Sequence, residues 1–158
     1  MSSDIRRTLL LIVKQDEILL AMKKRGFGAG LWNGVGGKLE PGETLEQALA
    51  RECKEEICVT PTAYHKVAEL DFFGGSAKEG LHMFVHAYMC TDWQGTPQET
   101  EEMAPQWFKK ESIPYEHMWQ DDQYWLPLVL AGKTVAGTFT FDTNNVLLTH
   151  ELREVPSL

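Results

Sequence analysis

Alternating apolar and polar positions near the start of the chain predict two strands, over residues 6–13 and 17–24, joined by a polar turn at residues 14–16. The apolar run in the first segment lacks a small-residue cleavage site, so we interpret it as a strand and not as a signal peptide. The same pattern predicts strands over residues 64–73, 81–90 and 106–109, a turn region at 91–97, and a closing hairpin of residues 134–142 and 146–153.

Two segments have the pattern of helices. Thr44 and Gln47 form a capping box ahead of residues 45–57, and residues 121–131 predict a second helix that Pro127 bends. Between the first hairpin and the first helix, residues 26–37 contain six glycines and predict a loop. Together these elements predict one α+β domain over residues 1–158, with a mixed sheet and two main helices.

Composition and charge narrow the function. A chain of 158 residues fits one domain, and no run of eighteen apolar residues predicts a membrane-spanning helix. The three cysteines, Cys53, Cys58 and Cys90, are too few for a disulfide framework and indicate a reducing, cytoplasmic compartment. The formal net charge of −8 makes a nucleic-acid polymer a poor ligand. We therefore expect the protein to bind phosphate groups through a metal ion.

Three glutamates share one face of the first predicted helix. Glu52, Glu55 and Glu56 stand three or four positions apart or side by side, and each close pair costs roughly 0.2–0.5 kcal/mol in repulsion. A hard divalent cation such as Mg²⁺, which prefers oxygen ligands, would explain this cost. The alternative is a solvated acidic face that Arg51 and Lys54 neutralise.

This helix and the loop before it resemble the signature of the Nudix hydrolases over residues 37–59. The family pattern is Gly, five residues, Glu, seven residues, Arg-Glu, an aliphatic residue, one residue, Glu-Glu, one residue, Gly and an aliphatic residue. The residues in register are Gly37, Glu43, Arg51, Glu52, Glu55, Glu56 and Val59. Cys53 replaces an aliphatic residue, and Cys58 replaces the glycine that ends the helix in a left-handed conformation, at a cost of about 1–2 kcal/mol.

The resemblance extends over nearly the whole chain to the branch of the family that acts on oxidised purine nucleoside triphosphates. The first strand and residues 73–88 are least alike. The segments that carry the resemblance are residues 22–30, 32–34, 94–97, 102–103, 107–108, 113–114, 118–119, 121–122 and 124–125.

This resemblance implies an α/β/α sandwich in which a mixed sheet lies between helices. It also implies a monomeric enzyme of the nucleotide pool that uses Mg²⁺, or Mn²⁺ in its place, and releases a nucleoside monophosphate and pyrophosphate. It places the metal at Glu52, Glu55, Glu56, Glu102 and the carbonyl of Gly36. The implied substrate-binding residues are Thr8, Lys23, Phe27, Asn33, Val35, Gly36, Gly37, Lys38, Phe72, Trp119, Asp121 and Asp122.

The resemblance gives several of these residues a specific role, with Phe27 and Trp119 on either side of the purine. Aromatic stacking is worth about 1–3 kcal/mol per base. Two adjacent acids in a closed pocket can have different pKa values, so that one donates and the other accepts a hydrogen bond to the base. The alternatives are a helix N-cap for Asp121-Asp122 and a core or lid aromatic for Trp119.

The catalytic residues are expected among Glu52, Glu55, Glu56 and Arg51. We expect Glu56 to be indispensable, while Glu52, Glu55 and Glu102 remain alternative general bases, and Arg51 orients the glutamates. His82 and His86 share a strand face, but no fixed metal motif surrounds them, so we expect structural or surface roles.

Three other functions remain open at this stage. The signature is common to Nudix enzymes that cleave ADP-ribose, dinucleoside polyphosphates or undamaged nucleotides. A non-catalytic binding module of the same fold would be expected to have lost its glutamates, which are intact here. An unrelated interaction scaffold would leave both the glycine-rich loop and the acidic face unexplained.

Overall fold

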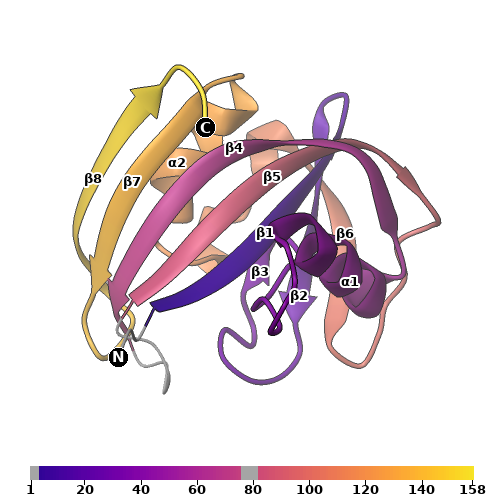
Figure 1. The fold of residues 1–158 in the computed structure, drawn as a ribbon, viewed down its shortest axis with the longest axis horizontal. Coiled ribbons are helices and arrows are strands. Elements are labelled where there is room, and N and C mark those ends of the chain that lie inside the picture. The colour runs from indigo at the N-terminus through magenta and orange to yellow at the C-terminus, as the bar shows by residue number, and fades with distance from the viewer. Residues whose placement is uncertain (1–3, 76–81) are drawn as a thin grey trace.

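One mixed β-sheet organises the chain. The computed structural model describes residues 4–75 and 82–158, and in this part of the chain eight strands follow the order β3-β2-β1-β5-β4-β7-β8, with β6 paired to β2. The strands are β1 (Asp4–Lys14), β2 (Glu17–Lys23), β3 (Trp32–Asn33), β4 (Thr60–Gly74), β5 (His82–Gln94), β6 (Met103–Lys109), β7 (Thr134–Phe141) and β8 (Leu147–Val155). Helix α1 (Leu45–Ile57) lies in front of the sheet in Figure 1 and α2 (Asp122–Leu130) lies behind it. This arrangement confirms the predicted α+β class.

Helix α1 begins and ends where the sequence predicts. The Thr44 hydroxyl accepts a hydrogen bond from the Gln47 backbone N–H at 3.1 Å, and the Gln47 side chain accepts one from the Thr44 N–H at 3.0 Å. Leu49, Cys53 and Ile57 are fully buried against the sheet. Burying this stripe fixes the rotation of the helix about its own axis, which determines where its glutamates lie.

Helix α2 covers the opposite face of the sheet. Trp125 and Val129 are buried in a core that includes Phe139 of β7. Pro127 lies inside α2, and the helix continues past it to Leu130. Two short 3₁₀ helices, Lys110–Ser112 and Tyr115–His117, precede α2 and were not predicted.

Several predicted boundaries were wrong, because pairing with a partner strand overrides a locally polar sequence. Strand β5 continues to Gln94, through part of the predicted turn region, because it pairs with the unexpectedly early start of β4 at Thr60. Strand β6 begins at Met103, and the glycine-rich loop contains the short β3, which pairs with β2. The predicted start of β5, at residue 81, lies outside the described residues.

Cys58 ends α1 in the left-handed conformation, with φ of +64°. Its backbone N–H donates to the Lys54 carbonyl at 3.0 Å, so the helix ends as it would with the usual glycine. All three cysteines are free thiols, with Cys53 and Cys90 buried, as expected. In the part of the chain that the structure describes, neither helix is long and apolar enough to span a bilayer.

Candidate active site

The segment Gly36-Gly37 is wedged between β1 and α1. The backbone N–H of Gly36 donates to Oε1 of Glu56 at 2.9 Å. A Cβ at Gly36 would lie 2.0 Å from the Thr8 carbonyl oxygen, and one at Gly37 would lie 2.7 Å from the Glu52 carboxyl group. A side chain at Gly36 would collide with the Thr8 backbone, whereas one at Gly37 would displace only the end of the Glu52 side chain, so glycine at Gly36 allows the loop backbone to contact Glu56 directly.

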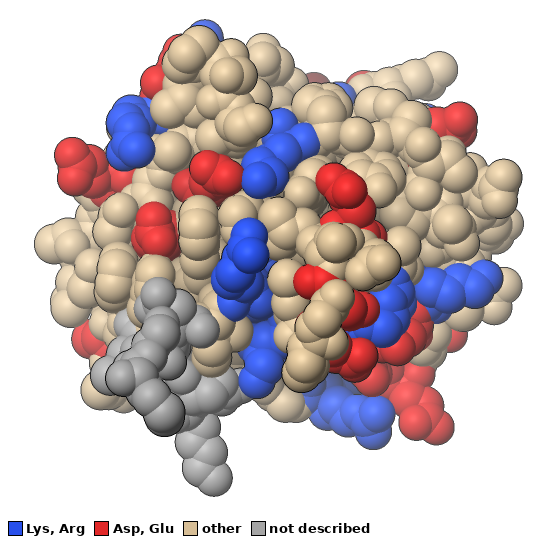
Figure 2. All heavy atoms as spheres, in the orientation of Figure 1, with Lys and Arg blue, Asp and Glu red and all other residues tan. Residues whose placement is uncertain are grey.

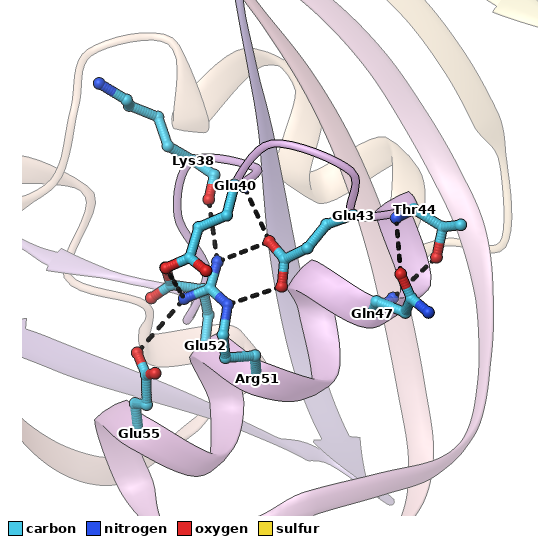
Figure 3. A network of polar contacts seen from close by, with 8 residues as sticks. All are labelled: Lys38, Glu40, Glu43, Thr44, Gln47, Arg51, Glu52 and Glu55. Atoms are coloured by element: carbon cyan, nitrogen blue, oxygen red, sulfur yellow. Dashed lines mark hydrogen bonds and ion pairs between the residues drawn. The ribbon is translucent and has the colours of Figure 1, made fainter.

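Arg51 connects this loop to α1 (Figure 3). Its guanidinium donates to both carboxylate oxygens of Glu43, at 2.7 and 2.9 Å, and to the Lys38 carbonyl at 3.1 Å. It also donates to Glu52 at 2.9 Å and to Glu55 at 3.3 Å. The bond from Arg51 lowers the pKa of Glu43 to about 2, so that carboxylate is ionised at neutral pH.

The glutamates nearest the loop repel one another. Burial, together with the charges of Glu52 and Glu102, raises the pKa of Glu56 to about 8, against the lowering effect of the Gly36 hydrogen bond and of Lys23. Burial also raises the pKa of Glu52, against the lowering effect of Arg51. Glu55, in contrast, is largely exposed and contacts Arg51. Figure 2 shows acidic and basic side chains interspersed over the face of the molecule that carries α1.

This donor set suits a hard divalent cation. The groups are carboxylate and carbonyl oxygens, which Mg²⁺ prefers, and Glu56 is a buried carboxylate whose charged form needs a compensating cation. Within residues 4–75 and 82–158, however, no three acidic, imidazole or thiol groups already converge on one point. Glu55 would have to leave Arg51 to join Glu52 and Glu56 around an ion.

A single cavity on the α2 side of the sheet reaches from the loop glycines to the start of α2. Ten of the twelve expected substrate-binding residues line it. These are Thr8, Lys23, Phe27, Asn33, Gly36, Gly37, Phe72, Trp119, Asp121 and Asp122. Glu56 also lines the cavity, so the residues expected to bind the base and the most buried glutamate share one wall.

Two expected residues lie elsewhere. Val35 exchanges backbone hydrogen bonds with Leu10 and is buried in the core beneath α1, so its side chain does not line the cavity. Lys38 does not line it either; its carbonyl binds Arg51, and its side chain points away from that network in Figure 3. The pairing of Val35 with Leu10 and the bond from Arg51 to Lys38 hold the two residues outside the cavity.

The two aromatic side chains expected to enclose a base contact each other instead. The ring centroids of Phe27 and Trp119 are 4.9 Å apart and the rings are tilted by 35°. A flat ring between two others needs about 7 Å between them. In this structure, Phe27 and Trp119 form a continuous aromatic wall, and the expected sandwich is not present.

The two aspartates at the start of α2 line the cavity. Both are buried, and Asp121 accepts a hydrogen bond from the indole N–H of Trp125 at 2.8 Å. Asp121 is the N-cap residue of α2 by position and Asp122 lies in its first turn, although the Asp121 side chain accepts no capping hydrogen bond. Burial raises the pKa of Asp121 to about 6, and burial together with the Asp121 charge raises that of Asp122 well above its usual value. Asp122 Oδ2 has no hydrogen-bond partner among the described residues.

The histidines lie away from this cavity. His82 contacts Asp71 at 2.7 Å, and His86 is buried beside Arg6 and Glu69. Burial lowers the pKa of His86 to about 4, so it is neutral at pH 7. Both histidines lie within the sheet, as expected of residues without a metal motif.

Sequence reasoning missed part of the cavity wall. Arg7 and Leu9 of β1, Met83 of β5, Phe141 of β7 and Asn145 all line it. One of these left a signal in the sequence. Arg7 shares a strand face with the buried Leu9, Leu11 and Val13, and a cation at an inward position of a strand indicates a ligand or a buried partner.

Known proteins are similar to this chain in sequence and in fold. The NUDIX domain family matches residues 4–129. The chain is 45% identical over 158 residues to the oxidized purine nucleoside triphosphate hydrolase of Mus musculus, covering 99% of each chain. It is 45% identical over 152 residues to the enzyme of the same name from Danio rerio, covering 96% of each. The crystal structure of a mutator MutT protein from Bacillus halodurans superposes with a TM-score of 0.82 at 24% identity, over 94% of this chain and 97% of that one, and so shows the same fold.

Proposed function

This chain belongs to the Nudix family, and we propose that it hydrolyses oxidised purine nucleoside triphosphates, such as 8-oxo-dGTP and 2-oxo-dATP, to nucleoside monophosphate and pyrophosphate. Two relatives that align over nearly their whole length carry this activity in their names. The observation that carries the proposal is the cavity itself, because it joins Trp119, Asp121 and Asp122 to Glu56 in one space. A nucleotide can therefore reach both ends at once.

The purine stacks on the aromatic wall of Phe27 and Trp119. Asn33 and the Asp121-Asp122 pair line the same cavity and supply donors and acceptors for the base edge. A protonated Asp122 donates a hydrogen bond, whereas an ionised carboxylate only accepts. Because the two aspartates can redistribute a proton between them, they can form hydrogen bonds with the edges of more than one oxidised purine.

Glu52, Glu55, Glu56 and Glu102, with the Gly36 carbonyl, would hold Mg²⁺ at the other end. When bound, the ion supplies charge neutralisation for the phosphates and lowers the pKa of a coordinated water. Arg51 positions Glu52 and Glu55 through the bonds described above. Lys23 lines the cavity close enough to Glu56 to lower its pKa, which places a cation where phosphate oxygens would lie.

The proposed substrate also suggests the oligomeric state, the compartment and the partners of the protein. We propose a monomer that acts on the free nucleotide pool in the cytoplasm, with no nucleic-acid polymer as a partner. The free thiols of Cys53, Cys58 and Cys90 suit a reducing compartment. The formal net charge of −8 opposes binding to a polyanion except through a metal ion.

The test compares 8-oxo-dGTP, dGTP and ADP-ribose as separate substrates of the purified protein with Mg²⁺. Release of monophosphate and pyrophosphate is measured, with Glu56→Gln as the inactive control. We expect 8-oxo-dGTP to be preferred over dGTP. A preference for ADP-ribose, or no hydrolysis of any of the three, would contradict the proposed substrate while leaving the fold unchanged.

A further inference from the structure

A second cation lines the cavity. Among the described residues, Arg7 and Lys23 are the two basic side chains in the cavity wall, and three carboxyl groups, those of Glu56, Asp121 and Asp122, share that wall. A nucleotide brings several further negative charges into this space. Lys38, the other cation expected near the phosphates, does not line it. The wall therefore takes its positive charge from two residues outside the family signature, Arg7 and Lys23.

The backbone places Arg7 beside the phosphate end. Arg7 forms an antiparallel bridge with Lys38, and the next residue, Thr8, donates its backbone N–H to the Gly37 carbonyl at 3.0 Å. On its other side Arg7 pairs with Val85 of β5. Arg7 is thus fixed next to the segment that contacts Glu56, and its side chain projects from the middle of the sheet into the same cavity as the aromatic wall.

The preceding residue provides an internal comparison. Arg6 and Arg7 are adjacent on β1, so their side chains point to opposite faces of the sheet. The Arg6 guanidinium is exposed and contacts the His86 ring at 3.3 Å, whereas Arg7 is half-buried and lines the cavity. A guanidinium group therefore lies on each face of the sheet, and of the two only that of Arg7 lines the cavity.

We propose that Arg7 is a substrate-binding residue whose guanidinium binds the phosphate group nearest the nucleoside. Its planar fork of N–H donors matches two phosphate oxygens, which a lysine cannot do with the same geometry. The base end of the cavity is defined by Trp119, Asp121 and Asp122, and the far phosphates extend towards Glu56. Arg7 lies on β1, beside the segment that contacts Glu56. This inference rests on the proposed function, because it takes a purine nucleotide as the ligand.

The test measures binding without metal or catalysis. Isothermal titration in EDTA compares 8-oxo-dGMP with its nucleoside, 8-oxo-deoxyguanosine, in wild type, Arg7→Gln and Arg6→Gln. For Arg7→Gln we expect binding of the monophosphate to weaken by about 10- to 100-fold and binding of the nucleoside by less than about 2-fold, as for loss of a charged hydrogen bond. Arg6→Gln should bind both probes as the wild type does.

Two results would overturn the inference. If Arg7→Gln weakens both probes equally, Arg7 supports the shape of the cavity and does not bind phosphate; if neither probe is weakened, Arg7 does not contact the ligand. Arg7→Lys should recover part of the monophosphate affinity, because it restores the charge without the fork. If the wild type itself binds neither probe, the proposed substrate class fails first, which is a distinguishable result.

Discussion

The acids of α1 and the acids at the start of α2 look alike in the sequence but behave differently in the structure. Glu52, Glu55 and Glu56 occupy a helix with both ends capped, and Arg51 contacts two of the three. Asp121-Asp122 stand at a helix start without a side-chain cap, buried, and the indole N–H of Trp125 donates to Asp121. Arg51 lowers the pKa of Glu52, whereas no basic side chain among the described residues lowers the pKa of either aspartate.

The difference shows what decides the state of a buried acid. A carboxylate that can meet a cation stays charged, because the attraction offsets the loss of hydration. A carboxyl group enclosed by apolar walls and a second acid becomes neutral instead. In this protein the first arrangement suits metal and phosphate, and the second suits a purine edge. The following experiments test that division.

The largest effect is expected for Glu56→Gln. We expect kcat with Mg²⁺ to fall on the order of 10³-fold, because the variant loses a charged oxygen that holds metal or accepts a proton. The melting temperature in metal-free buffer should be no lower than that of the wild type, since glutamine can still accept from Gly36 N–H and no longer buries a charge. Glu46→Gln, in the first turn of the same helix, is the control and should retain full activity. Substantial activity in Glu56→Gln would place the essential acid elsewhere.

The aspartates should differ in their contribution to stability. Asp121→Ala should lower the free energy of unfolding by about 1–3 kcal/mol, because the buried indole N–H of Trp125 loses its acceptor. At pH 4, Asp122→Asn should change it by less than about 0.5 kcal/mol, because asparagine resembles the neutral acid in shape. Chemical denaturation at pH 4 measures both values. Equal losses in the two variants would show that Asp122 is ionised in the folded protein.

Stability at different pH should separate the Asp121-Asp122 pair from His86. The folded pKa of Asp121 is raised from 3.8 to about 6, so its contribution to stability is full below pH 3.8 and is lost as the pH rises through about 6. The folded pKa of His86 is lowered from 6.5 to about 4, by burial and by Lys66 and Arg6 against Glu69. Its contribution is therefore full above pH 6.5 and is lost as the pH falls towards 4.

Two variants measure these opposite slopes. Relative to the wild type, His86→Gln should gain about 2 kcal/mol in free energy of unfolding between pH 7 and pH 4. For Asp122→Asn the free energy of unfolding should increase relative to that of the wild type as the pH rises from 4 to 8. Parallel curves for the wild type and both variants would mean that neither site has a shifted pKa.

The smallest effect concerns the end of α1 next to Glu55 and Glu56. Cys58→Gly should raise the free energy of unfolding by about 1 kcal/mol, because glycine adopts a φ of +64° without steric cost. Cys58→Ala also removes the thiol but keeps a Cβ, so it should bring no gain. If the two variants are equally stable, the left-handed conformation is not strained at this position.

Sequence patterns predicted the elements that carry their own signals. The capping box at Thr44 and the buried stripe of Leu49, Cys53 and Ile57 located α1 to the residue, because helix propensity, capping and periodicity agree there. Strand boundaries were less accurate. Residues 91–94 have a turn-like composition, yet they form a strand because β4 supplies the hydrogen-bonding partner.

The candidate site divides in the same way. The spacing of Glu52, Glu55 and Glu56 and the glycines of the preceding loop is local, so the family and its acidic face could be read directly from the chain. The contact between Phe27 and Trp119 joins residues 92 positions apart, and no local pattern could show that the two rings touch. For the same reason the sequence could not show that the Val35 side chain packs in the core beneath α1, since the face on which it lies depends on its pairing with Leu10.

The sequence by itself determined the Nudix family, the position and capping of α1, and the helix face that Glu52, Glu55 and Glu56 share. These depend on near neighbours, whose geometry is set by backbone periodicity. Only the tertiary structure decided which of those acids are buried, that burial raises the pKa of Asp121 and Asp122, and that Arg7 lines the cavity while Arg6 does not. Burial depends on which distant strands and helices enclose a group, and charge state follows from burial.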